Sequence, residues 1–383
     1  MRRLVLNRTL RYGRRGFTLI ELMITVALST LVGVLIYTVF IEQTKAYRIQ
    51  ADMGNMQQNL RVAMEMVTRD LSTAGWGTSY TGATWGVDGQ DGALNDAIYG
   101  LHILDDFPLG GGSDALEIMM MDPDRNTWAM TDADVSETCD TNAITLAGAD
   151  LAMAATFSDA GPNTRIMCYS ATGMGGRSHS YVWDVDGTGD AATGVVTVIA
   201  NTQTDYSNEC VNALPKHMVC APPIWLAYYI DRNGADGIGI GSATLPVLYL
   251  VSDVGVAMAA GGYPLTSDIP VALGIEDLQF QVCEAGLGLD CELAASWTSS
   301  YDMEESSSTA ASWWNLAAVR VLMTARTLRP DVQDSTVSQR IDIDTTDSFI
   351  PTTGLDSYHR RVARTEVTIR NAVGSWQLRN QPF

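Results

Sequence analysis

The first 75 residues carry two successive hydrophobic patterns. Residues 17–41 are almost continuously apolar, and Glu21 is the only carboxylate among them. As an α-helix, the twenty-five residues of this run would extend about 38 Å, enough to cross a hydrocarbon core of about 30 Å. The first pattern therefore predicts a membrane-spanning helix over 17–41.

The second pattern repeats apolar side chains at helical spacing between residues 45 and 74. These side chains share one face: Met53, Met56, Leu60, Met64, Val67, Leu71 and Ala74. Polar and charged residues fill the other face, which predicts an amphipathic continuation of the helix, packed against a globular head. We expect the helix, taken as 17–75, to end at the Gly75-Trp76-Gly77 break.

After residue 76 the pattern changes to short β-branched and aromatic runs bounded by Gly, Asn, Asp and Pro, which predict antiparallel strands. The runs occupy 195–199, 224–230, 247–254, 278–282, 318–327 and 361–370. The sequence thus predicts an α+β fold, a long N-terminal helix packed on a large β-rich antiparallel head. We divide the head into an elaborated β-rich subdomain or insertion over 76–220 and an antiparallel sheet over 221–383.

Charge separates the beginning of the chain from the rest. The formal net charge is −20, which disfavours binding to nucleic acid through bulk charge. Residues 1–16 nevertheless hold six arginines and no acidic residue. The positive-inside rule therefore keeps this end in the cytoplasm and places the head across the membrane. A secretory signal peptide fits less well, because its apolar core has only about 7 to 15 residues and a small-x-small site follows it.

The string RRGFTLIEL, residues 14–22, resembles the processing and assembly signal of type IV pilins and of the pseudopilins of type II secretion. The resemblance implies a basic prepilin leader over 1–16 and a pilin-like fold. It also implies that a prepilin peptidase cuts between Gly16 and Phe17 and methylates the new amine of Phe17. In such families, the glutamate at the position of Glu21 meets that amine on a neighbouring subunit.

Simple electrostatics supports this role for Glu21. An ionised carboxylate in a lipid-facing helix costs on the order of 3 kcal/mol, so it should be neutralised or paired. A carboxylate and an ammonium about 4 Å apart gain roughly 4 kcal/mol before desolvation is subtracted. The alternative is a glutamate that merely snorkels to the membrane surface.

Two further stretches narrow the resemblance. Residues 59–77 resemble the segment after the membrane helix in PilW-type minor pilins, and residues 358–374 resemble the closing strand of that family and of J-type minor pseudopilins. Residues 227–234 and 274–283 fit less specifically. The resemblance implies a minor pilin that initiates or caps a type IV pilus, with its head at the tip against other minor pilins or an adhesin.

The same resemblance implies location and partners. The chain would wait in the inner membrane, anchored by helix 17–41 with its head in the periplasm, and then join the fibre at the cell surface. Its partners would be the major pilin, other minor pilins, the prepilin peptidase and the assembly platform.

Two alternatives stay open at this point. The first is a J-type minor pseudopilin of a type II secretion system, which shares the leader, the helix and the closing strand. The second is a membrane-anchored extracellular binding module or hydrolase that uses residues 78–220. The sequence contains no G-x-S-x-G, Walker or H-E-x-x-H motif, so we assign no catalytic residue and expect no enzyme.

All six cysteines follow the membrane segment: Cys139, Cys168, Cys210, Cys220, Cys283 and Cys291. An even count in an oxidising compartment favours disulfides. Pairing of nearest neighbours would join Cys139 to Cys168, Cys210 to Cys220 and Cys283 to Cys291. A zinc site is the rival, but the chain has no C-x-x-C and its four histidines are scattered.

No cofactor is required, but two acidic loops are candidates for structural calcium. The first copies the first half of an EF-hand loop with Asp184, Asp186, Thr188 and Asp190. Its twelfth position is Val195 instead of the bidentate glutamate, so a carboxylate would have to come from elsewhere. The second and weaker candidate offers Asp231, Asn233 and Asp236, and a solvated turn explains either loop equally well.

Overall fold

The structure is a computed structural model of the chain. It describes residues 16–78, 83–85, 97–98, 100–104, 113–122, 127–135, 141–146, 157, 161–170, 179–185, 192–198, 218–231, 246–252, 268–284, 291, 297–298, 316–329 and 358–369. The chain divides into two compact units, residues 1–53 and 54–383. The helix α1 begins in the first unit and ends in the second.

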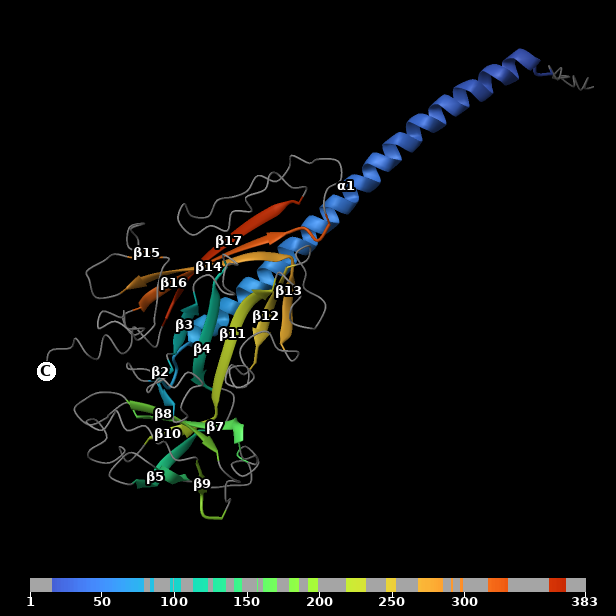
Figure 1. The fold of residues 1–383 in the computed structure, drawn as a ribbon. Coiled ribbons are helices and arrows are strands. Elements are labelled where there is room, and N and C mark those ends of the chain that lie inside the picture. Colours follow the sequence, from blue (N-terminus) through green and yellow to red (C-terminus); the bar gives the residue numbers. More distant parts are fainter. Residues whose placement is uncertain are drawn as a thin grey trace, which may run out of the picture. The chain divides into compact units, whose positions relative to one another are not determined.

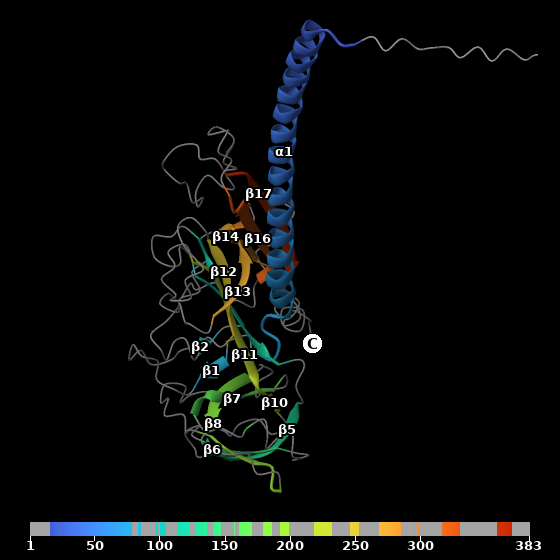
Figure 2. The ribbon, with the colours of Figure 1, turned by 90° about the vertical axis from the view of Figure 1, so that its right-hand side faces the viewer.

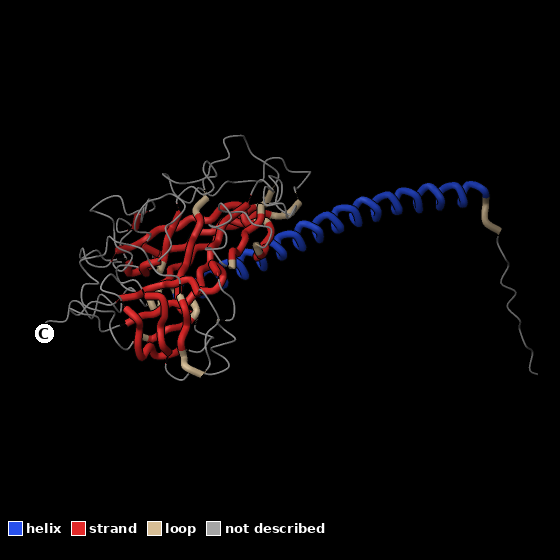
Figure 3. Tube along the Cα trace, turned by 60° about the horizontal axis from the view of Figure 1, so that its bottom comes forward, coloured by secondary structure: helices blue, strands red, loops and turns tan. Residues whose placement is uncertain are grey.

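Among the described residues, one long helix precedes a series of strands (Figure 3). The helix α1 spans Leu19–Thr73 without interruption. This confirms the long helix predicted over 17–75, apart from the residues at its two ends. The helix plus antiparallel β-rich head confirms the predicted fold class.

Two of the three sheets lie beside the C-terminal part of α1, residues 54–73 (Figures 1 and 2). The five-stranded sheet has the order β13 (Ile269–Leu273), β12 (Val247–Val251), β11 (Pro223–Asp231), β4 (Ala115–Met121), β3 (Leu101–Leu104). The four-stranded sheet has the order β15 (Trp297–Thr298), β14 (Ile275–Glu284), β16 (Leu316–Arg326), β17 (Arg360–Thr368). Every pairing described in these two sheets is antiparallel.

The third sheet is built from residues that the sequence pattern had assigned to the elaborated segment. It has eight strands in the order β2 (Ala97–Ile98), β1 (Ala83–Trp85), β8 (His179–Val185), β7 (Gly161–Ser170), β10 (Val219–Ala221), β5 (Trp128–Val135), β6 (Thr141–Leu146), β9 (Val195–Thr197). The β1–β8 pairing is parallel. Strands β3 and β4 also come from 76–220 but pair within the five-stranded sheet, so a boundary at residue 220 does not separate the sheets.

One apolar stripe of α1 forms the centre of the main core. Its fully or nearly buried members are Met56, Leu60, Ala63, Val67 and Leu71, and Ala74 continues the stripe directly after the helix. They pack with side chains of both neighbouring sheets, such as Ile118, Tyr228 and Phe280. Each buried aliphatic side chain contributes roughly 1.5–3 kcal/mol, so the stripe is a major source of stability for the second unit.

The five- and four-stranded sheets are joined by a polar link at the start of β4. The Asp114 amide donates to the Leu278 carbonyl at 2.8 Å, and the Asp114 carboxylate accepts the Phe280 amide at 2.8 Å. The Ser113 hydroxyl also accepts the Leu278 amide at 3.0 Å. These buried groups satisfy the backbone of β14 on the edge opposite β16, where no neighbouring strand is described at Leu278 and Phe280, as buried backbone polar groups require.

A second link between the two sheets runs through Gly274, which connects β13 to β14. This residue has φ 77°, its amide donates to Pro246 and its carbonyl accepts from Arg326. A Cβ atom there would lie 2.7 Å from the carbonyl oxygen of Arg326. Only glycine fits a left-handed conformation against another backbone, because it has no Cβ.

The end of α1 is fixed to the five-stranded sheet by backbone hydrogen bonds. The Gly75 amide donates to Met119 at 3.1 Å, and the Met121 amide donates to the Trp76 carbonyl at 2.8 Å. Gly77 has φ 79°, and a Cβ atom there would meet the Met121 side chain at 2.5 Å. The predicted glycine break therefore ends the helix and also lets the chain pair closely with β4.

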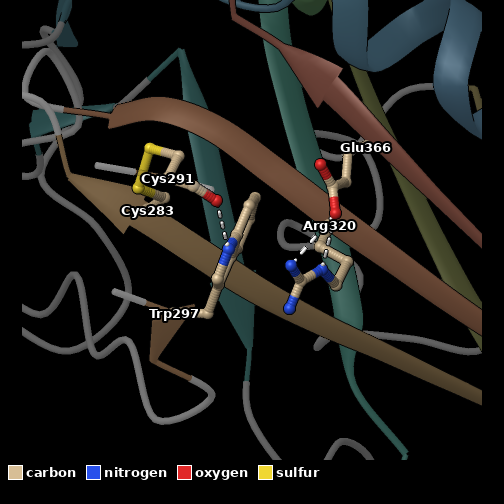
Figure 4. The surroundings of a disulfide bond; sticks show 5 residues. All are labelled: Cys283, Cys291, Trp297, Arg320 and Glu366. Carbon is tan, nitrogen blue, oxygen red and sulfur yellow. Dashed lines mark hydrogen bonds and ion pairs between the residues drawn. A yellow bond between two sulfur atoms is a disulfide. The ribbon is translucent and has the colours of Figure 1, made fainter. Parts of the chain in front are cut away.

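The structure contains a disulfide between Cys168 and Cys220 and another between Cys283 and Cys291 (Figure 4). The first corrects the nearest-neighbour expectation, which was wrong for both Cys168 and Cys220. The two residues are direct partners on the adjacent strands β7 and β10, so proximity in the sheet outweighs distance in sequence. The pair Cys283–Cys291 is the one expected, while Cys139 and Cys210 lie outside the described residues.

The geometry at Gly274 leads to a stability prediction. Replacing Gly274 with Ala should lower the free energy of unfolding by about 2 kcal/mol, because a left-handed alanine costs roughly 1–2 kcal/mol before the clash with Arg326 is counted. The measurement is denaturant unfolding of the full-length protein in detergent. The matched control is Gly54→Ala in α1, where a Cβ atom would meet nothing within 4 Å. Its stability should stay equal or rise by up to about 1 kcal/mol.

Candidate assembly site

The predicted processing site lies just before α1 begins. Gly16, Phe17 and Thr18 are not helical, so the bond between Gly16 and Phe17 lies outside the regular backbone of the helix. A Cβ atom on Gly16 would meet nothing within 4 Å, and the Phe17 side chain is 83% exposed. The structure therefore leaves this peptide bond accessible.

Glu21 and Thr18 cap the start of the helix through reciprocal hydrogen bonds. The Glu21 carboxylate accepts the amide and the hydroxyl of Thr18, both at 3.1 Å. In return, the Glu21 amide donates to the Thr18 hydroxyl at 3.3 Å. This capping box satisfies two backbone donors that a helix start otherwise leaves open, and it places a negative charge where the helix dipole favours it. The spacing T-x-x-E would have identified Thr18, which the sequence analysis missed.

Glu21 is therefore held in place without a cationic partner among the described residues. Its carboxylate oxygens remain at the surface of the helix, where a positively charged group of another molecule can reach them. Chemically, the fixed Glu21 carboxylate can bind a cation at the start of the helix.

Three threonines of the apolar segment return their hydroxyl groups to the backbone of the helix itself. Thr25 donates to the Glu21 carbonyl at 2.9 Å, Thr30 to the Ala27 carbonyl at 2.8 Å, and Thr38 to the Leu35 carbonyl at 2.8 Å. Hydroxyl donors satisfied in this way do not need water. Their satisfaction lowers the cost of placing this surface in lipid or against other apolar helices.

The apolar side chains of this segment cover every side of the helix. Within the described residues, α1 is the one helix long and apolar enough to cross a membrane, and its most apolar stretch has no buried residue. Large side chains such as Leu22, Leu28 and Leu35 are each more than half exposed. Such a surface is unstable in water, so it requires an apolar environment around all of its faces.

The other end of α1 carries a buried charge that ties the helix to the head. Asp70 is 6% exposed, and its carboxylate accepts the hydroxyl of Tyr228 on β11 at 2.6 Å. Arg69 forms an ion pair with the same carboxylate at 2.9 Å. Burial raises the pKa of the Tyr228 phenol, and the hydrogen bond to Asp70 raises it further. The sequence analysis did not find this pair, because its members are far apart in the chain.

The candidate calcium loops are only partly described. Asp184 lies in β8, and Asp231 is a buried residue at the end of β11. Asp186, Thr188, Asp190, Asn233 and Asp236 lie outside the described residues. Among the residues that the structure does describe, no group of three or more His, Cys, Asp or Glu side chains is arranged to hold a metal ion.

A comparison with protein families agrees with the motif at the start of the chain. Residues 11–37 match the family described as "Prokaryotic N-terminal methylation motif", so the chain carries a type IV prepilin-like motif around Gly16, Phe17 and Glu21. A solved structure of a type IV-like pilin from Thermus thermophilus is similar over 82% of this chain and 97% of that chain, with 10% identity and a TM-score of 0.31. A comparison with curated proteins finds no match.

The buried pair Asp70–Tyr228 leads to a prediction with two parts. Tyr228→Phe should lower the free energy of unfolding at neutral pH by about 1–3 kcal/mol, because the buried carboxylate loses its hydrogen-bond donor. A tyrosine whose pKa is higher in the folded than in the unfolded state stabilises the fold fully below about pH 10 and loses this contribution as the pH rises further. Above pH 10, the wild type should therefore lose stability more steeply than the variant.

Denaturant unfolding at several pH values measures both effects. The control is Tyr47→Phe, since the Tyr47 side chain is 73% exposed and its loss should change stability little. Equal stability of Tyr228→Phe and wild type at neutral pH would contradict the role of this hydrogen bond.

Proposed function

We propose that the chain is a minor pilin of a type IV pilus, a structural subunit of the PilW-like kind. The observation that carries the proposal is the methylation motif over residues 11–37, together with the exposed apolar helical segment up to residue 41, whose single carboxylate is capped. The resemblance of residues 59–77 to PilW-type minor pilins favours this function over a J-type pseudopilin. No residue is assigned a catalytic role.

Processing would come first. A prepilin peptidase would remove the basic leader 1–16 at the accessible bond between Gly16 and Phe17 and methylate the amine of Phe17. Until assembly, α1 would hold the chain in the inner membrane with its head in the periplasm. The arginines of the leader support this orientation through the positive-inside rule.

Assembly would then use the capped carboxylate. Cleavage leaves the cationic amine of Phe17 beside Thr18, so each processed subunit presents a cation and an anion within the same helix start. Glu21 of one subunit would bind the amine of a neighbouring subunit and fix their axial register. In an apolar bundle of helices, this contact is strong because little water competes with it.

The head would define the place of the subunit in the filament. Its size and its third sheet support a position at the tip, in contact with other minor pilins or an adhesin, where a large head does not obstruct further subunits. The major pilin and the assembly platform would engage the same apolar helix before the subunit joins the fibre.

Processing can be tested at Gly16. In Gly16→Val the branched side chain should prevent close approach of the scissile bond to the peptidase, so the chain should keep its leader. Mass spectrometry of the N-terminus of the protein purified from membranes measures the result. The matched control is Gly33→Ala, another position where a Cβ atom meets nothing within 4 Å, and this variant should begin at Phe17. A wild-type chain that still begins at Met1 would contradict the proposal.

The role of the Glu21 charge can be separated from its role in capping. Glu21→Gln keeps an oxygen that accepts the Thr18 hydrogen bonds but removes the negative charge, so cleavage should remain normal. Recovery in sheared filaments, measured by immunoblot, should fall at least tenfold, consistent with a pair that gains roughly 4 kcal/mol before desolvation. Thr18→Ser, which keeps the hydroxyl, should assemble normally. Wild-type recovery of Glu21→Gln would refute the charge pairing.

A further inference from the structure

One sheet edge in the head differs from the others. Among the described strands that end a sheet, β2, β3, β9 and β15 have two to four residues. The edge strand β13 contains Pro270, which cannot donate a backbone hydrogen bond. In contrast, β17 ends the four-stranded sheet with nine residues and no proline. Long edges without such protection are the usual places where a further strand adds to a sheet.

The hydrogen bonds between β16 and β17 show which backbone groups face this edge. The Thr327 amide donates to His359, and the Ile369 amide donates to Ala317. Inward and outward backbone groups alternate along an antiparallel strand, and the register between β16 and β17 has no shift. The odd-numbered residues therefore face β16, and the outward amides and carbonyls include those of Val362, Arg364, Glu366 and Thr368.

The charge of β17 is opposite to that of the chain. Its nine residues include Arg360, Arg361, Arg364 and Glu366, a net charge of +2, whereas the whole chain carries −20. The Arg360 side chain is only 8% exposed and is paired with Glu276. Arg361 is exposed, and the Arg364 side chain is 54% exposed. Arginines on an edge repel basic strands and accept acidic ones, so they select among strands that could pair there.

The single acidic residue of β17 is already engaged within the sheet (Figure 4). Arg320 on β16 binds the Glu366 carboxylate at 3.0 Å, and Arg364 binds it at 3.0 Å. The Trp297 ring covers the Arg320 guanidinium at 3.8 Å, and its indole donates to the Cys291 carbonyl at 2.9 Å. The disulfide Cys283–Cys291 therefore supports a chain of contacts that holds β17 in position, which reduces the ordering cost of binding there.

We propose that the outer edge of β17 binds an extended acidic segment of a partner protein by β-strand addition. The outward amides and carbonyls would supply the main-chain hydrogen bonds, and the exposed Arg361 and Arg364 would select acidic side chains. A second copy of this chain fits less well, because its β17 would bring another strand of charge +2. This inference concerns the head alone and does not depend on the assembly role of α1.

Proline substitution tests the proposal by removing a single backbone N–H donor from the edge. Thr368 is exposed and its amide faces outward, so Thr368→Pro removes an edge donor and leaves the hydrogen bonds to β16 in place. The probe is a blocked nine-residue peptide of alternating Glu and Val, added to the full-length protein in detergent. We expect the peptide to bind the wild type and to bind Thr368→Pro about tenfold more weakly.

Three controls accompany this measurement. Thr368→Ala keeps the amide and should bind the Glu–Val peptide within about twofold of wild type. A peptide of alternating Lys and Val should not bind the wild type. The variant Arg364→Glu should bind the Glu–Val peptide more weakly than the wild type does. Hydrogen exchange should show slower exchange of the outward amides when the Glu–Val peptide is present.

Each contrary result would overturn the proposal. The proposal fails if the Glu–Val peptide does not bind the wild type. It also fails if the peptide binds Thr368→Pro as tightly as it binds the wild type. Outward amides that are already protected without peptide would mean that the chain covers its own edge. Self-association that Thr368→Pro abolishes would assign the edge to a second copy.

Discussion

The second unit depends on the burial of one stripe of α1 between two sheets. Leu60, Val67 and Leu71 are almost fully removed from water, and side chains from the five- and four-stranded sheets complete the same core. Without this part of the helix, both sheets would expose the apolar faces that now cover it. The head is therefore built as a continuation of the helix, so any force applied to the helix acts directly on the core of the head.

In both halves of the helix, polar groups that lie among apolar side chains are satisfied by hydrogen bonds. At the start, Glu21 and Thr18 satisfy each other, and the threonines that follow return their hydroxyls to the backbone. In the head, the buried carboxylate of Asp70 accepts the Tyr228 hydroxyl. A buried polar group without a partner costs several kcal/mol, so each group has a partner close by or across the packed interface. The difference is that Glu21 lies exposed on the helix surface, whereas Asp70 is buried.

The sequence predicted features that are local and missed those that depend on strand order. The helix and the strands β9, β11, β12, β14, β16 and β17 follow from spacing and composition. Strand β4 is buried along its whole length, so it lacks the alternation that marks a strand. The pairing of Cys168 with Cys220 depends on the adjacency of β7 and β10, and the link from Asp114 to Phe280 crosses the chain. Neither leaves a local signal, whereas Thr18 could have been found from its spacing to Glu21.

The distribution of charge means that electrostatic forces act differently on the apolar helix and on the acidic head. Without the six arginines of residues 1–16, the chain has 18 basic and 44 acidic residues, a net charge of −26, and such heads repel one another in solution. The proposed contacts between helices would lie in an apolar environment where salt has little access, so they would be able to overcome this repulsion. Contacts of the head lie in water, where charges are screened over about 8 Å at physiological ionic strength. On an acidic head, a cationic strand edge would therefore attract an acidic segment only at short range.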